Sequence, residues 1–208
     1  MKYYFFRHGE SEANAAKLFA SVKINPVLTE KGRGQAANMQ LVMKDIPIER
    51  IYVSPLIRAK ETAGIIFPGR ELMIDDNLRE TNVGVLDGVN FADPIIWKRY
   101  KDVVDAWENG NHSARFEGGE SNVEIKARIE KVLRRANKEC TKSAAFVAHS
   151  DILRSLFWFF CENHGKTMQD NYMEKGRLTV VSREEKSNIY RIEKFNVASL
   201  KYEVQSTK

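Results

Sequence analysis

Short apolar runs alternate along the chain with longer segments whose apolar residues recur every three or four positions. The short runs are bounded by polar or turn-forming residues, as buried strands are, and lie at residues 2–6, 50–53 and 144–148. The longer segments have helical spacing and lie at residues 29–44, 93–107, 121–140 and 150–162. This alternation predicts an α/β fold, a three-layer α/β/α sandwich with a mostly parallel central sheet.

Capping residues and turn formers refine the element boundaries. Ser121 is followed three residues later by Glu124, the capping-box pattern of a helix start. We expect this helix to carry, on or near its buried face, Val123, Ala127, Ile129, Val132 and Leu133. Ser54 and Pro55 predict another helix start, with Ser54 as N-cap and Pro55 in the first helical position. Further strands are predicted at residues 71–75, 178–182, 188–194 and 199–204.

No internal repeat, low-complexity segment or clear linker divides the 208 residues, so we expect one domain over residues 1–208. The segment 89–117 is long and contains Trp97, Tyr100, Trp107 and Phe116. It is predicted to be a helical, lid-like insertion over part of a ligand site. The alternative is that these aromatic side chains only pack the helix onto the core.

The composition is that of a globular protein, with 43% hydrophobic and 29% charged residues. The net charge of +5 suits anionic ligands such as phosphates, but basic and acidic residues are mixed, so we expect no nucleic-acid partner. No apolar run approaches the length of a membrane span, and the chain has no secretory-type start, so no membrane association and a cytoplasmic location are expected. Cys140 and Cys161 form no metal or redox motif; a disulfide between them stays open, and reduced thiols are favoured.

Two predicted strands end in histidine. Arg7, His8 and Gly9 follow the strand at residues 2–6, and His149 follows the strand at residues 144–148. Ligands of open α/β sheets bind beyond the carboxyl ends of the strands, and the tips of parallel strands lie at one edge. Each histidine alone is also compatible with an ordinary core or surface role, whereas two at equivalent tips predict a shared site.

The longer motifs identify a family resemblance. In chain order they are Arg7-His8-Gly9-Glu10-Ser11-x-x-Asn14, Ser54-Pro55-x-x-Arg58-Ala59-x-x-Thr62-Ala63, Leu78-x-Glu80 followed by Gly84-x-x-x-Gly88, Gly119-Glu120-Ser121, and the strand that ends in His149. This set resembles the histidine phosphatase superfamily, which includes the cofactor-dependent phosphoglycerate mutases. It covers about residues 3–155. The Gly-Glu-Ser element is expected to be structural, because Ser121 caps a helix.

The resemblance implies phosphoryl transfer through a phosphohistidine on His8, with Glu80 as the proton donor. It further implies that Arg7, Arg58 and His149 surround the phosphoryl oxygens in place of a metal ion. Asn14 adds a neutral donor. The backbone N–H of Ser150 is expected to face the phosphate. The partner is then a small phosphorylated metabolite, and neither a metal nor another cofactor is expected.

Departures from the family pattern refine this reading. Phosphoglycerate mutases carry Arg-His-Tyr after the glutamate, whereas this chain has Thr81-Asn82-Val83 after Glu80. We therefore predict a phosphatase, with a mutase as the alternative. After His149 the family usually has glycine, and here Ser150-Asp151 stands instead. Asp151 either favours a helix N-terminus or repels a dianionic substrate, which keeps a catalytically weak, ligand-binding regulatory member as a further alternative. A homodimer is one option for the assembly.

Overall fold

A computed structural model describes residues 1–185 and 187–199. Its strands are β1 (Lys2–Arg7), β2 (Arg50–Val53), β3 (Met73–Ile74), β4 (Ser143–Ala148), β5 (Leu178–Arg183) and β6 (Tyr190–Val197). Its helices are α1 (Glu12–Ala15), α2 (Glu30–Met43), α3 (Ile57–Ile66), α4 (Pro94–Glu108), α5 (Asn122–Glu139) and α6 (Ser150–Phe160). Three short 3-10 turns are Asp76–Leu78, Gly84–Leu86 and Gln169–Asn171.

The strands form one mixed sheet in the order β3-β2-β4-β1-β5-β6. The neighbours among β3, β2, β4 and β1 are parallel, whereas β5 runs antiparallel to both β1 and β6. In the β1–β4 register Arg7 lies opposite Ala148, and the backbone N–H of His8 donates to the Ala148 carbonyl at 3.1 Å. His8 and His149 therefore leave the sheet side by side, as parallel tips predict.

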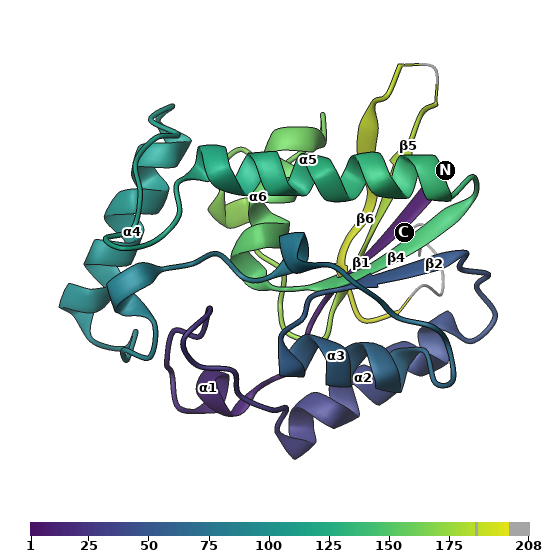
Figure 1. Cartoon of the computed structure of the whole chain (residues 1–208), viewed down its shortest axis with the longest axis horizontal. Coiled ribbons are helices and arrows are strands. Elements are labelled where there is room, and N and C mark those ends of the chain that lie inside the picture. Colours follow the sequence, from purple (N-terminus) through teal and green to yellow (C-terminus); the bar gives the residue numbers. More distant parts are fainter. Residues whose placement is uncertain (186, 200–208) are drawn as a thin grey trace, which may run out of the picture.

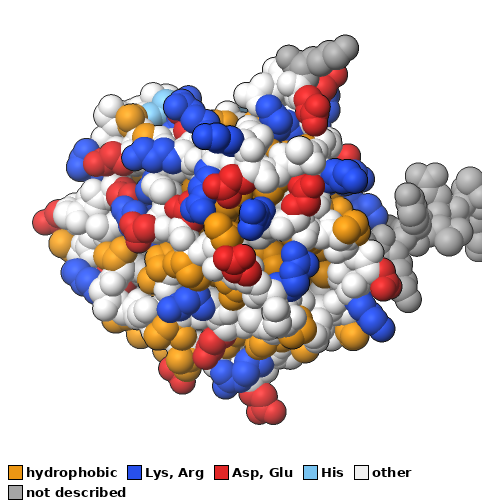
Figure 2. Space-filling view, turned by 45° about the vertical axis from the view of Figure 1, so that its right-hand side comes forward, with side chains coloured by type: hydrophobic (Ala, Val, Ile, Leu, Met, Phe, Trp, Pro, Cys, Tyr) orange, Lys and Arg blue, Asp and Glu red, His pale blue; other side chains and the backbone are white. Residues whose placement is uncertain are grey.

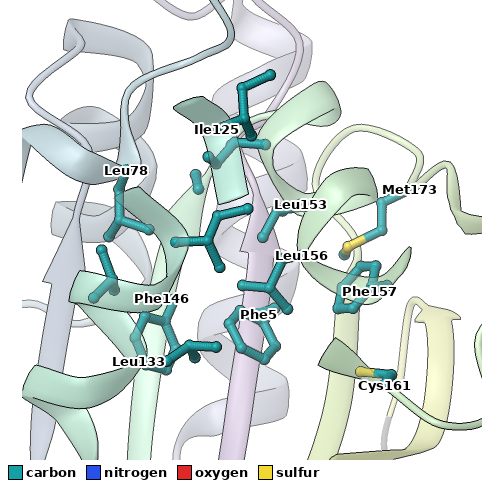
Figure 3. Close-up of a cluster of buried hydrophobic side chains, with 14 of the residues drawn as sticks. Phe5, Leu78, Ile125, Leu133, Phe146, Leu153, Leu156, Phe157, Cys161 and Met173 are labelled. Carbon is teal, nitrogen blue, oxygen red and sulfur yellow. The ribbon is translucent and has the colours of Figure 1, made fainter. Parts of the chain in front are cut away.

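Helices cover both faces of the sheet, which confirms the α/β fold (Figure 1). The α5 and α6 helices lie on one face and α2 and α3 on the other. Phe5 of β1 stacks on Phe146 of β4 with ring centroids 4.7 Å apart, and Phe157 of α6 meets Phe5 edge-on (Figure 3). Burial of these apolar rings is the main stabilisation of the layers. The α4 helix lies beyond the end of the sheet where β1 and β4 finish (Figure 1).

Three details of the prediction need correction or fall outside the described chain. The helix after β2 begins at Ile57 with Leu56 as N-cap, so Ser54 does not cap it; the Ser54 hydroxyl is held by His149 instead. Val123 is 52% exposed, and Ala127 is also exposed, because the first turns of α5 turn that face to solvent. The predicted strand at residues 199–204 lies, apart from Ser199, outside the described residues.

The outer surface mixes charges of both signs. On the face shown in Figure 2, basic and acidic side chains are interspersed and form no block of one sign. Within the described residues, no helix has both the length and the apolar character that crossing a bilayer requires. Cys140 and Cys161 are both buried and unpaired.

Candidate active site

A cavity of about 320 Å³ opens at the carboxyl ends of β1 and β4. Six of the seven predicted site residues line it: Arg7, His8, Asn14, Arg58, Glu80 and Ser150. The seventh, His149, is fully buried directly beside His8, and the centroids of the two imidazole rings lie 5.0 Å apart. The residues that the sequence grouped into one site thus lie together around one cavity. The role of each residue in chemistry stays a prediction.

The His8 ring is oriented by main chain. Its Nδ1 lies 2.6 Å from the Gly9 carbonyl, and a carbonyl can only accept, so Nδ1 carries the proton and Nε2 is free of one. Nε2 accepts the Nε–H of Arg58 at 3.2 Å. Gly9 is required here because a Cβ at this position would lie 2.3 Å from the Gly32 carbonyl oxygen. The imidazole therefore presents an unprotonated nitrogen to the cavity.

Both histidines are held in the neutral form. Burial lowers the pKa of His8 well below its ordinary value, and the charges of Arg58 and Arg7 lower it further. Burial likewise lowers the pKa of His149, again with help from Arg58. His149 Nε2 lies 2.7 Å from the Ser54 hydroxyl, which fixes this ring at the end of β4. A neutral imidazole keeps the lone pair that a nucleophile needs.

Two arginines place positive charge against His8. Arg58 is 1% exposed, and its Nη2 donates to the Ala20 carbonyl at 2.9 Å. Arg7 donates through Nη1 to the Met173 carbonyl and lies 4.8 Å from the centre of the Tyr172 ring. Within the described residues, Arg58 Nη1 and Arg7 Nε are buried and have no hydrogen-bond partner. Donors left unsatisfied beside a cavity are available to an anion.

Glu80 lies at the N-terminus of α6. Its carboxyl group accepts backbone N–H groups of Thr81 at 2.9 Å, Asp151 at 3.1 Å and Ile152 at 3.2 Å. Burial and the nearby charge of Asp151 nevertheless raise the pKa of Glu80 to about 7. The side chain can therefore both release and accept a proton near neutral pH.

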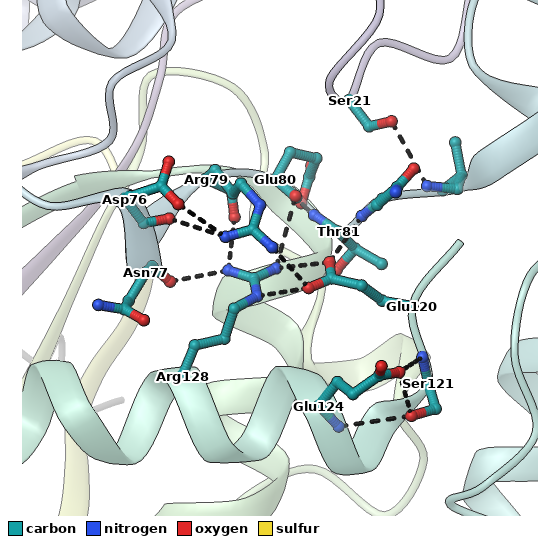
Figure 4. Close-up of polar contacts among 12 residues, drawn as sticks. Ser21, Asp76, Asn77, Arg79, Glu80, Thr81, Glu120, Ser121, Glu124 and Arg128 are labelled. Carbon is teal, nitrogen blue, oxygen red and sulfur yellow. Dashed lines mark hydrogen bonds and ion pairs between the residues drawn. The ribbon is translucent and has the colours of Figure 1, made fainter. Parts of the chain in front are cut away.

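A buried ion-pair network holds the loop that carries Glu80 (Figure 4). Arg128 of α5 binds Glu120 at 2.8 Å and donates to the carbonyls of Asn77 and Arg79 at 2.7 and 2.9 Å. Glu120 also accepts the Asn82 backbone N–H at 2.8 Å. The sequence singled out the Gly-Glu-Ser element only for the cap at Ser121, which the structure confirms as a capping box. The anchoring role of Glu120 was missed.

Sequence reasoning also missed a buried group around Asp151. Both oxygens of Asp151 accept the Tyr100 hydroxyl at 2.9 Å, and one accepts Nη2 of Arg154 at 2.9 Å. Arg154 also donates to the Tyr100 hydroxyl. All three residues line the cavity. In the sequence, this group is indicated only by Asp151 and Arg154, two opposite charges three residues apart at the start of a mostly apolar helix.

Comparison with known proteins places the chain in one protein family. A family model described as "Histidine phosphatase superfamily (branch 1)" matches residues 3–197. A protein named "Probable phosphoglycerate mutase GpmB" of Erwinia tasmaniensis is 34% identical over 139 residues, which cover 64% of this chain and 61% of that protein. The adenosylcobalamin/alpha-ribazole phosphatase of Salmonella typhi is 29% identical over 167 residues, covering 75% and 77%. The chain thus matches less than two thirds of the first relative's length.

Solved structures share the fold along nearly the whole chain. The alpha-ribazole phosphatase from Shigella flexneri has a TM-score of 0.79 at 21% identity and covers 98% of this chain and 100% of its own. The mycobacterial glucosyl-3-phosphoglycerate phosphatase, in complex with VO3, has a TM-score of 0.80 at 23% identity and covers 94% and 98%.

Proposed function

Because the chain belongs to the histidine phosphatase superfamily, we propose that it is a phosphomonoesterase that hydrolyses a small phosphorylated substrate through a phosphohistidine. The observation that carries the proposal is a single cavity lined by His8, Arg7, Arg58 and Glu80. It brings together a neutral nucleophile, two cations and a carboxyl group whose pKa is raised to about 7. Phosphoryl transfer requires these three kinds of group.

In the first step His8 Nε2 attacks phosphorus while Nδ1–H stays on the Gly9 carbonyl. The Nε–H of Arg58, which donates to Nε2 without substrate, turns to a phosphoryl oxygen. Arg7, Asn14 and the Ser150 backbone supply further hydrogen-bond donors to the phosphoryl oxygens. The His149 ring, which lies beside the His8 ring, also acts on these oxygens. The bond from phosphorus to the leaving oxygen breaks, and protonated Glu80 gives its proton to that oxygen. The free alcohol departs, and the phosphoryl group stays on Nε2.

In the second step water attacks the phosphohistidine. Glu80, now a carboxylate, accepts a proton from the water as the new P–O bond forms and the P–N bond breaks. Inorganic phosphate leaves, His8 returns to the neutral form, and Glu80 is again protonated. The two arginines balance the charge on the phosphoryl oxygens in both steps, so the scheme needs no metal ion.

The residues after Glu80 favour hydrolysis over the mutase alternative. The Asn82 backbone N–H binds Glu120, and the Asn82 side chain accepts the Gly84 N–H at 2.9 Å. Thr81 and Val83 are buried and carry no charge. A second anionic group on the substrate would therefore meet no cation at positions 81–83.

The test is product analysis with the full chain. Purified protein with chelator is given a panel of phosphorylated metabolites, and both inorganic phosphate and isomeric phosphates are measured. We expect inorganic phosphate from at least one monoester, and an acid-labile phosphoryl label on His8 after rapid quenching. An isomeric phosphate as the main product would establish the mutase instead. Binding of substrates without turnover would establish the regulatory alternative, and release that depends on an added metal would contradict the mechanism.

A further inference from the structure

One part of the cavity lining is aromatic. Phe19, Phe91, Trp97 and Tyr100 form it together, and we call them the aromatic wall. Phe19 lies 4.9 Å from Tyr100 and 5.5 Å from Phe91 between ring centroids, and Trp97 lies 5.2 Å from Tyr100. Leu18 and Val83 extend the apolar lining. The four rings thus form one continuous surface.

Contacts within the chain hold the wall in place. Phe19 and Phe91 come from two segments that pair through backbone hydrogen bonds, from Phe19 N–H to the Val89 carbonyl at 3.0 Å and from Phe91 N–H to the Lys17 carbonyl at 2.8 Å. Tyr100 is fixed by the buried Asp151 group described above. Trp97 packs beside these rings and is still 44% exposed. Covering clustered apolar surface that is open to water with an apolar group of a ligand lowers the free energy, so this surface favours binding of such a group.

Three cations of the cavity lining act on His8, and we call this part of the lining the phosphate end. Arg7 and Arg58 surround His8, and Lys175 is close enough to His8 to lower its pKa as well. Of the cavity-lining residues beside the wall, Arg154 is the cation, and its charge is matched by Asp151 at 2.9 Å. A carboxylate on the leaving group would therefore lose hydration at the wall, where the cation Arg154 is already paired with Asp151.

We infer that the aromatic wall binds the leaving group and selects phosphate monoesters whose alcohol carries a flat apolar or aromatic group over those whose alcohol carries a carboxylate. This inference rests on the proposed hydrolysis where it concerns kcat/KM, because the wall binds the group that is esterified to the phosphate at His8. It makes Trp97 and Phe91 specificity-determining residues. It also gives the segment predicted as a lid a direct part in the site, because α4 supplies Trp97 and Tyr100.

The test compares substrates whose alcohols have similar acidity, so that intrinsic reactivity does not decide the result. 3-Phenylpropyl phosphate is compared with propyl phosphate, and 3-carboxypropyl phosphate serves as the carboxylated ester. We expect kcat/KM to favour the phenylpropyl ester over both others by roughly 10–200-fold, the range that apolar pocket contacts provide. Trp97→Ala should lower kcat/KM for the phenylpropyl ester about 10-fold more than it lowers kcat/KM for propyl phosphate.

Matched controls separate the wall from general damage. Ile95→Ala removes an apolar side chain from the same helix that is 72% exposed and does not line the cavity, so the preference should stay as in the wild type. Phe91→Leu gives a second wall variant in case Trp97→Ala fails to fold. Equal kcat/KM for all three esters, or a preference for 3-carboxypropyl phosphate, would overturn the inference and leave the proposed hydrolysis standing.

Binding measurements keep the inference testable without turnover. The non-hydrolysable 3-phenylpropylphosphonate and propylphosphonate are titrated calorimetrically into the wild type and the wall variants. Tighter binding of the phenylpropyl compound, lost in Trp97→Ala or Phe91→Leu, supports the wall even if no ester is hydrolysed and the proposed function fails. Equal binding of the two phosphonates by the wild type would contradict the wall.

Discussion

The two ends of the cavity are built by different means. At the phosphate end, His8 leaves a central strand, its ring is held by the Gly9 carbonyl, and its neighbour Arg58 is 1% exposed. At the aromatic wall, Phe19, Phe91 and Trp97 come from a loop pair and from α4, outside the sheet, and Trp97 is 44% exposed. The His8 ring is thus positioned by buried main chain, whereas the aromatic wall consists of side chains from segments outside the sheet.

Because of this difference, catalysis of the chemical step and selection among substrates can be tested independently. Groups that act on the reacting atoms need fixed geometry and are sensitive to small displacements. Contacts to the remote part of a substrate contribute smaller, graded energies. Loss of the nucleophile at the phosphate end should therefore abolish turnover of every substrate, whereas substitutions at the wall should change the order of preference among substrates.

The strongest test of the phosphate end is His8→Ala. The variant has no nucleophile, so kcat should fall by about 10⁴-fold or more for every monoester. The readout is phosphate release in the presence of chelator, and His164→Ala, which does not line the cavity, serves as the control. Substantial residual turnover of the purified variant would contradict a phosphohistidine on His8.

Glu80→Gln separates proton transfer from binding. The amide cannot protonate the leaving oxygen, so kcat for propyl phosphate should fall by about 10²–10⁴-fold. The loss should be much smaller for 4-nitrophenyl phosphate, whose leaving group needs no proton. Glu117→Gln, an exposed carboxylate outside the cavity, is the control. Equal losses for both esters would show that Glu80 is not the proton donor.

Glu120→Gln tests whether the phosphate end depends on its buried support. The change leaves Arg128 buried without its charged partner, so the free energy of unfolding should fall by about 3–5 kcal/mol. Urea denaturation measures it. Glu130→Gln breaks an exposed ion pair with Arg134 on α5, the helix that carries Arg128. It should lower the free energy of unfolding by about 0–1 kcal/mol. Similar costs for both variants would mean that the network around Glu120 is not a special support.

The pH profile links the two ends through Asp151. Hydrolysis needs protonated Glu80, so kcat/KM should fall as pH rises through the Glu80 pKa of about 7. Asp151 raises that pKa, and Asp151→Asn should therefore move this alkaline limb to lower pH. The wild type, Asp151→Asn and the exposed Asp102→Asn are compared on one substrate, so that its own ionisation cancels. An unmoved limb, or a shift to higher pH, would contradict the assignment.

The same contrast explains what the sequence could predict. Arg7, His8, Arg58 and Glu80 lie in local motifs at strand and loop ends, so their spacing indicates a common site, and the cavity contains all four. Asp151 was ambiguous because its partner Tyr100 is 51 residues away, and only the fold brings them within 2.9 Å. Pairing of that kind depends on the path of α4, which no local pattern specifies.

The errors have equally physical causes. The Ser54-Pro55 pair has the chemistry of a helix start, yet its hydroxyl lies 2.7 Å from a buried imidazole nitrogen of His149. The same hydroxyl also accepts the Leu56 backbone N–H at 3.3 Å, and the helix begins two residues later than predicted, with Leu56 as its N-cap. Val123 has an apolar side chain in an amphipathic helix, but the capping turn at Ser121 rotates it to the surface. Local propensity was overridden in the first case by a distant partner and in the second by helix phase.

The backbone pairing that carries Phe19 and Phe91 has a consequence for protein engineering. Its hydrogen bonds use only N–H and carbonyl groups, which every residue except proline provides in full. The two positions can therefore be randomised in a combinatorial library without altering the register of the paired segments. Such a library would test whether the aromatic wall sets the proposed choice among phosphate esters while the residues around His8 stay untouched.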